Sequence, residues 1–92
     1  MKKSPGDLIN TILTIKNAQT LDAFFNEIFT HAERKDFMLR WELMKMLIEG
    51  LSQRAIASKL GVSLCKITRG ARILKDSESI TYQLLKRQKA NS

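Results

Sequence analysis

The chain has 92 residues, of which 27% are charged, and a formal net charge of +7. This length is enough for one small domain and too short for two. One histidine and one cysteine can form neither an intrachain disulfide nor a metal cluster. The chain also lacks a Gly-rich phosphate loop and a nucleophile elbow, so we do not expect an enzyme.

The N-terminal sequence does not have the form of a secretion signal. Residues 2–7 contain two lysines followed by proline, glycine and aspartate, and no continuous apolar segment comes after them. No apolar run in the chain approaches the length of a transmembrane helix. We therefore expect a cytoplasmic protein that makes no membrane contact.

Three helices are expected in the first half of the chain. Ser4 and Pro5 begin a helix that extends to about Asn17, and Thr20 caps a short helix that carries several phenylalanines. The third begins at a capping box, Thr30 to Glu33, and ends at Gly50. All three are apolar on more than one side, and Trp41 and the methionines of the third helix are assigned to a core.

The segment 51–75 predicts a helix-turn-helix. Ser52 is placed to cap its first helix, Gly61 to end that helix in a left-handed conformation, and Ser63 to cap the second. The second helix has an apolar stripe at helical spacing and basic residues on its other side. In such a unit the second helix enters the DNA major groove. The alternative is an ordinary helical hairpin with a solvated basic face.

The charge distribution favours DNA. Residues 1–50 hold seven basic and seven acidic side chains, whereas residues 51–92 hold nine basic and two acidic ones. Within 51–75 there are six basic residues and no acidic one. Such a basic segment is typical of proteins that bind a polyphosphate such as DNA. A membrane surface also attracts basic helices, but this segment lacks the broad apolar face needed for insertion.

A last helix is expected after Asp76–Ser79, which gives six helices and no strand, an all-α fold. We interpret residues 1–92 as one helical DNA-binding domain. Residues 1–50 would form a dimerisation core, residues 51–75 the helix-turn-helix and residues 76–92 the C-terminal helix. The apolar surface of the first helices exceeds what so small a chain buries alone, so we expect an obligate homodimer.

From Glu27 to Lys75 the sequence resembles the Trp repressor family. The resemblance rests mainly on Ser52-Gln53-Arg54 and on Ile67-Thr68-Arg69-Gly70 followed by Leu74-Lys75. It implies a six-helix, intertwined homodimer with two helix-turn-helix heads that acts as a transcriptional repressor. It also implies L-tryptophan as the corepressor, bound between the dimer core and each head, where it sets the spacing of the heads for successive major grooves of an operator.

The resemblance assigns ligand roles to matching positions. Arg40 and Arg69 fall where two guanidinium groups sandwich the indole, and Thr30 falls where a hydroxyl meets the carboxylate. Backbone carbonyls at Glu27 and Phe29, from the other subunit, would accept from the ammonium. The remaining positions of this ligand set are Gly70, which permits close approach, and Ile73, where the family has a serine that contacts the ammonium.

The DNA-facing positions depart further from the family. Ala57 replaces a lysine, Ala71 and Arg72 replace Ser and Asn, and 64–66 reads Leu-Cys-Lys in place of Ile-Ala-Thr. The operator sequence therefore cannot be inferred. The expected DNA-binding set is Gln53, Arg54, Ser63, Leu64, Cys65, Lys66, Thr68, Arg69, Gly70, Ala71, Arg72 and Lys75.

Together these features predict a tryptophan-activated repressor of genes for tryptophan biosynthesis or transport. One alternative is a helix-turn-helix regulator of the same fold whose ligand has changed or is absent. Another is a helical dimerisation module that binds a protein and not DNA, against which the acid-free segment 51–75 argues.

Overall fold

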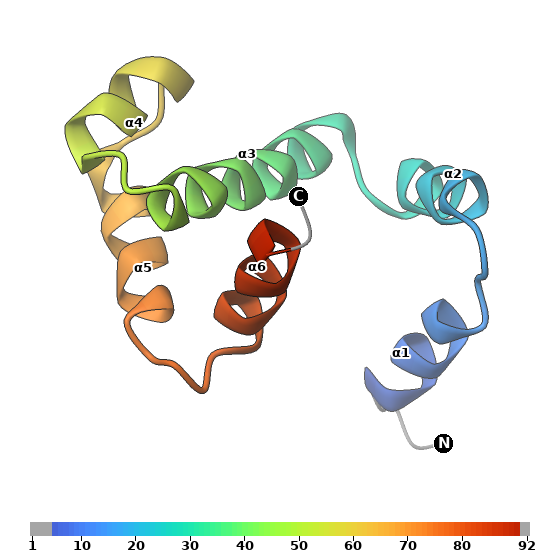
Figure 1. The fold of residues 1–92 in the computed structure, drawn as a ribbon. Helices are drawn as coiled ribbons and strands as arrows, with labels where there is room; N and C mark the ends of the chain where they lie inside the picture. Colours follow the sequence, from blue (N-terminus) through green and yellow to red (C-terminus); the bar gives the residue numbers. More distant parts are fainter. Residues whose placement is uncertain (1–4, 91–92) are drawn as a thin grey trace. The chain divides into compact units, whose positions relative to one another are not determined.

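The computed structural model describes residues 5–90, and within them it contains six α-helices and no strand. The all-α, six-helix prediction is therefore confirmed. The chain divides into two compact units, one ending at Lys35 and one beginning at Asp36. The helices are α1 (Pro5–Leu13), α2 (Ala18–Ile28), α3 (His31–Ile48), α4 (Gln53–Leu60), α5 (Leu64–Leu74) and α6 (Ile80–Ala90) (Figure 1).

Two boundaries in the N-terminal unit differ from the prediction. Helix α1 ends at Leu13, four residues before Asn17, because the next two amides bond carbonyls only three residues back, at 3.0 Å each, in a tightened final turn. The cap of α2 is Asn17 and not Thr20. The extended backbone of Asn17 lets its Oδ1 accept from the Thr20 amide at 2.8 Å, which places Thr20 inside the first turn. Ser4 lies outside the described residues.

The junction of α2 and α3 is fixed by side-chain hydrogen bonds. The Thr30 amide donates to Glu33 Oε1 at 2.9 Å, and the Glu33 amide donates to Thr30 Oγ1 at 3.1 Å, so the predicted capping box is confirmed. The Arg34 guanidinium forms an ion pair with the Asp22 carboxylate and also donates to the Asp22 carbonyl at 3.2 Å. The Arg34 contacts hold α2 at Asp22 against the start of α3.

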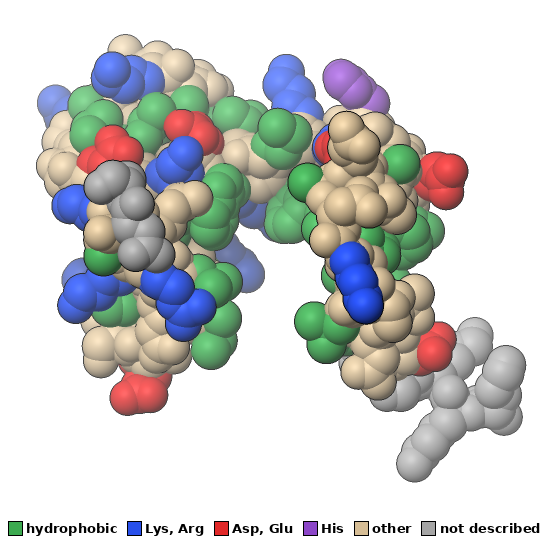
Figure 2. All heavy atoms as spheres, turned by 45° about the vertical axis from the view of Figure 1, so that its right-hand side comes forward, with side chains coloured by type: hydrophobic (Ala, Val, Ile, Leu, Met, Phe, Trp, Pro, Cys, Tyr) green, Lys and Arg blue, Asp and Glu red, His purple; other side chains and the backbone are tan. Residues whose placement is uncertain are grey.

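Apolar side chains of the N-terminal unit remain uncovered. Leu13 is 74% exposed and Ile28 56% exposed, and no residue of α2 is buried. Figure 2 shows hydrophobic side chains, in green, open to solvent on this unit. All the buried hydrophobic residues of the described chain, Leu43, Ile56, Ile67 and Leu85, belong to the C-terminal unit. The N-terminal unit thus has no core of its own.

The C-terminal unit has its core where α3, α4 and α5 meet. Leu43, Ile56 and Ile67 are at most 2% exposed and pack together, one from each helix. Half-buried side chains from α3 and from the α4–α5 turn surround them. Leu85 of α6 is also 2% exposed. Helix α5 is therefore held by its apolar stripe, which leaves its other side to solvent.

The caps of α4 and α5 lie where the sequence predicts them. The Ser52 hydroxyl accepts from the Ala55 amide at 3.1 Å, and the Ser63 hydroxyl accepts from the Lys66 amide at 3.4 Å. Gly61 ends α4 with φ +63°, a conformation that a side chain would disfavour. The two helices are therefore joined by a short turn with defined ends.

The assignment of Trp41 and the α3 methionines to a core holds only in part for the single chain, since Met44 and Met46 are partly buried against the core cluster. Trp41 is 38% exposed and Met38 is 60% exposed, and only Leu43 of α3 is buried. The helix carries apolar residues on several sides, and α4 and α5 pack at its C-terminal part, so the other sides stay uncovered. It ends at Ile48, just before Gly50, which has φ +93°.

Candidate functional site

A cavity of about 380 Å³ lies in the C-terminal unit beside α3 and α5. Its floor is apolar and aromatic, and its polar groups are basic side chains and one hydroxyl; no acidic residue lines it. A cavity of this size accommodates a small ligand. The lining residues are Phe37, Arg40, Trp41, Leu43, Met44, Lys66, Arg69, Gly70, Ile73 and Thr81.

Four of the seven expected ligand residues line this cavity. Arg40 comes from α3, and Arg69, Gly70 and Ile73 come from α5. Both arginines are exposed, so their guanidinium groups are accessible to a ligand. A planar cation of this kind suits an aromatic face and a carboxylate. The cavity therefore has the chemistry for a flat, apolar, anionic molecule.

The other three expected ligand residues lie in the N-terminal unit. Thr30 precedes α3; its hydroxyl accepts from Glu33 and retains its own proton to donate. Glu27 is in the last turn of α2, where backbone carbonyls lack helical N–H partners, and Phe29 follows that helix. This unit contributes no residue to the lining described above. Their ligand roles remain predictions.

Gly70 leaves room for α5 to approach α3 closely, because it has no side chain. A Cβ built on Gly70 would lie 2.7 Å from Leu43 Cδ1, and Gly70 itself is buried. Leu43 is 2% exposed, which leaves it little room to move away. The glycine therefore brings α5 against α3 and sets the width of the cavity between their side chains.

One carboxylate joins two of the cavity's cations. Asp36 Oδ2 lies 2.9 Å from Arg40 Nη2, one turn along α3, and Lys66 Nζ of α5 donates to Asp36 Oδ1 at 2.7 Å. The hydrogen bond from Lys66, together with the charges of both cations, holds the pKa of Asp36 below its usual range despite some desolvation. Asp36 is therefore ionised at neutral pH.

Sequence reasoning gave no ligand role to six residues that line the cavity, and of these Lys66 was assigned to DNA alone. The six are Phe37, Trp41, Leu43, Met44, Lys66 and Thr81. Asp36 was not assigned at all. Its spacing from Arg40 is the i, i+4 spacing of helical ion pairs and could have indicated that contact, whereas Lys66 is thirty residues away in sequence.

The outer side of α5 carries five of the twelve expected DNA-binding residues. A shallow hollow there is lined by Leu64, Cys65, Thr68, Arg69 and Arg72. Figure 2 shows Lys and Arg side chains, in blue, spread over the C-terminal unit.

The remaining expected DNA-binding positions differ in exposure. Gln53 of α4 is exposed and accepts from the Thr68 hydroxyl at 3.3 Å, while Arg54 and Lys75 are exposed as well. Ser63 serves as the α5 cap. Gly70 is buried and Ala71 half-buried, so neither presents a side chain to the outer surface.

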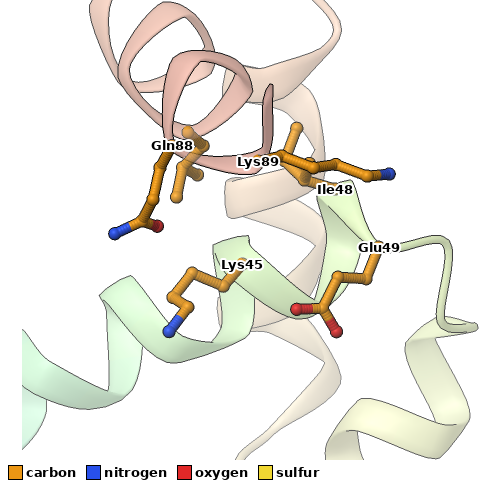
Figure 3. A pocket seen from close by; sticks show the side chains of 6 residues that line it. Lys45, Ile48, Glu49, Gln88 and Lys89 are labelled. Atoms are coloured by element: carbon orange, nitrogen blue, oxygen red, sulfur yellow. The ribbon is translucent and has the colours of Figure 1, made fainter. Parts of the chain in front are cut away.

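A separate hollow of about 350 Å³ lies between α3 and α6. Figure 3 shows the residues that line it: Lys45 and Ile48 on α3, Glu49 directly after that helix, and Gln88 and Lys89 on α6. Its rim carries charges of both signs, and it shares no residue with the cationic cavity.

The described residues contain neither a candidate metal site nor a candidate membrane-spanning helix. No group of three or more His, Cys, Asp or Glu side chains within 5–90 is placed to hold a metal ion. None of the helices in this range is long and apolar enough to cross a membrane.

The fold and site define a small all-α protein in which one exposed basic helix forms a wall of a cationic, ligand-sized cavity. Comparison with known proteins identifies the family. The family model described as Trp repressor protein matches residues 5–89, and this chain belongs to that family. The family consists of regulators, so the prediction that the chain is not an enzyme is confirmed.

Named relatives agree with the family match. A Trp operon repressor homolog of Chlamydia trachomatis serovar L2 is 36% identical over 93 residues, covering 96% of this chain and 99% of the relative. A homolog of the same name from Chlamydia caviae is 35% identical and covers 88% of this chain and 81% of its own length. One from Xylella fastidiosa strain M23 is 37% identical over 76% of this chain and 77% of its own length. No solved structure matches the chain significantly.

Proposed function

We propose that the protein is a DNA-binding transcriptional repressor of tryptophan biosynthesis or transport genes, activated by L-tryptophan as corepressor. One observation carries the proposal. Arg40 and Arg69, the two arginines expected to sandwich an indole, line one cavity, and Arg69 also belongs to the exposed basic side of α5. The names of the relatives support tryptophan operon regulation.

In this proposal the indole lies between Arg40 and Arg69, with Gly70 and Ile73 beside it. The carboxylate is held by Arg69 and by the Thr30 hydroxyl. Carbonyls at Glu27 and Phe29 of the second subunit accept from the ammonium. The apolar and aromatic floor of the cavity supports a flat ring as its occupant.

DNA contact is assigned to the α4–α5 helix-turn-helix, with α5 in the major groove. Arg54, Lys75 and the α5 cations Lys66, Arg69 and Arg72 supply affinity through phosphates and base edges. This assignment is supported by segment 51–75, which has no acidic residue and whose six basic residues are exposed. The remaining assigned residues are Gln53, Ser63, Leu64, Cys65, Thr68, Gly70 and Ala71.

We infer that the working form is an intertwined homodimer. The uncovered apolar side chains of α1 and α2, with no buried residue in α2, support a partner surface for this unit. Sedimentation equilibrium over a wide dilution series should show no folded monomer. A folded 10.5 kDa species at micromolar concentration would contradict the inference.

Duplex DNA binding with and without L-tryptophan tests the function. Binding to a matching operator should tighten with L-tryptophan, and affinity should fall with salt at roughly −0.9 in the slope of log K against log salt for each phosphate contact. Replacing Lys75 with Ala should weaken binding similarly for all sequences, whereas replacing Arg72 should also change sequence preference. Salt-independent binding would favour a protein-binding module.

A second candidate is a regulator of the same fold with a different ligand. The observation that favours it is Ile73, an alkyl side chain on the cavity wall where the family has an ammonium-contacting serine. Tight, salt-dependent DNA binding with no response to L-tryptophan would select this candidate.

A further inference from the structure

The carboxylate of Asp36 is paired with Lys66, a cation to which the proposed function assigns a DNA contact. Lys66 lies in the first turn of α5, next to its capping residue Ser63, which is the part of a recognition helix that faces the bases. Its Nζ donates to Asp36 Oδ1 at 2.7 Å. A lysine whose ammonium is hydrogen-bonded to an internal carboxylate must give up that contact before it can bind a phosphate.

The contact is well formed for an exposed ion pair. The second oxygen of Asp36 is paired with Arg40 at 2.9 Å, so each oxygen has its own cation. Asp36 and Arg40 are one turn apart within α3. The pairing with Arg40 restrains the Asp36 carboxylate, so the contact with Lys66 costs less side-chain entropy in Asp36.

The pair remains open to exchange with a phosphate. The Lys66 side chain is 47% exposed and the Asp36 side chain 31% exposed. Solvent therefore screens the attraction, and an exposed pair of this kind changes an equilibrium by about two- to fivefold. An effect of this size on DNA affinity is large enough to measure. It is also small enough for a DNA phosphate to compete with Asp36 for Lys66.

We propose that Asp36 is an internal competitor of DNA for Lys66, so that the chain withholds one of its own DNA contacts. The inference rests on the proposed DNA-binding function. Asp36 is a positioning residue in this scheme, because it acts on DNA through Lys66. It also ties that lysine to Arg40, a cation of the ligand cavity, so one carboxylate contacts both proposed sites.

The test measures binding of the full-length protein to random-sequence duplex DNA, without ligand, over a series of salt concentrations. Asp36→Asn should bind about two- to fivefold tighter than wild type at low salt. Its slope of log K against log salt should be steeper by up to about 0.9, the increment for one phosphate contact. The gain should vanish when Lys66→Ala is also present.

Glu42→Gln is the matched control, because it removes one negative charge from the same helix and its partner, Lys45, is outside the DNA-binding set. Lys66→Ala alone serves as a second measurement that needs no change at Asp36. It should weaken binding less than Lys75→Ala, because the gain from a Lys66–phosphate contact is partly offset by the contact with Asp36 that Lys66 gives up.

The outcomes separate the inference from the proposed function. A gain for Asp36→Asn that survives Lys66→Ala, or that Glu42→Gln reproduces, is a net-charge effect and overturns the inference. Equal or weaker binding by folded Asp36→Asn also overturns it. If Asp36→Asn does not fold, a Lys66→Ala loss as large as that of Lys75→Ala decides against it. If wild type binds no duplex DNA, the proposed function fails first.

Discussion

Ile73 allows the ligand assignment to be tested at a single side chain. In the family a serine at this position contacts the ligand ammonium, and here an isoleucine lines the same cavity, half-buried. An alkyl group accepts no hydrogen bond. No acidic side chain lines the cavity, whereas Arg40, Lys66 and Arg69 do. An ammonium in this cavity would therefore depend on carbonyls from elsewhere and would meet three cationic side chains, of which Arg40 and Lys66 are paired with Asp36.

The magnitude follows from the lost hydrogen bond. A hydrogen bond to a charged group contributes about 1.5–3 kcal/mol net, which corresponds to a roughly ten- to hundredfold change in affinity. We predict that the wild-type protein discriminates poorly between L-tryptophan and its desamino analogue indole-3-propionate. Ile73→Ser should raise the preference for L-tryptophan by about that factor.

Calorimetric titration of both ligands against each variant measures the effect. Ile73→Ala is the matched control, because it enlarges the cavity about as much as serine does without adding a hydroxyl. The preference should therefore change with serine and not with alanine. A wild type that already favours L-tryptophan several hundredfold, with no gain from serine, would show that Ile73 does not face the ammonium.

Three further predictions concern α3 and α5. Arg40→Ala should abolish the tryptophan response in a DNA-binding assay and leave ligand-free, nonspecific affinity nearly unchanged; equal loss of both would make Arg40 structural. Gly70→Ala should destabilise the fold by about 1 kcal/mol in urea unfolding, because overpacking against Leu43 at 2.7 Å costs about 1–3 kcal/mol and helix propensity returns at most about 1; a more stable variant would refute the close contact. Asp36 has a lowered pKa, so its ion pairs stabilise the fold above its unfolded value near 3.8 and are lost as pH falls through the lower folded value. The urea midpoints of wild type and Asp36→Asn should converge on acidification from neutral pH, and a constant difference would contradict the assignment.

The elements that the sequence predicts well are those fixed by neighbouring residues. Caps at Ser52 and Ser63 and the capping box at Thr30 depend on side chains that reach amides three residues away, so a short segment determines them. The error at α2 has the same local origin. Asn17 and Thr20 are both good capping residues, and the choice between them depends on where the preceding helix ends.

The features that could not be predicted depend on tertiary placement. The Asp36–Lys66 bond joins residues thirty positions apart and requires the packing of α5 on α3. Trp41 is on an apolar-rich helix, and hydrophobicity alone could not distinguish a core residue from one that lines a cavity. The ligand roles of Arg40 and Arg69 came from the family resemblance, since charge and spacing alone also fit solvated surface residues.

The position of Arg69 gives a physical reason for ligand and DNA to affect each other. Its side chain lines both the cationic cavity and the hollow on the outer side of α5. A ligand that stacks on this guanidinium therefore restricts a group to which the proposed function assigns a DNA contact, and no chain of intermediate residues is required. Coupling between two binding events is reciprocal. DNA that fixes Arg69 must therefore change the affinity for the ligand by the same factor by which the ligand changes the affinity for DNA. Lys66, held by Asp36, would add to this coupling only after the carboxylate releases it.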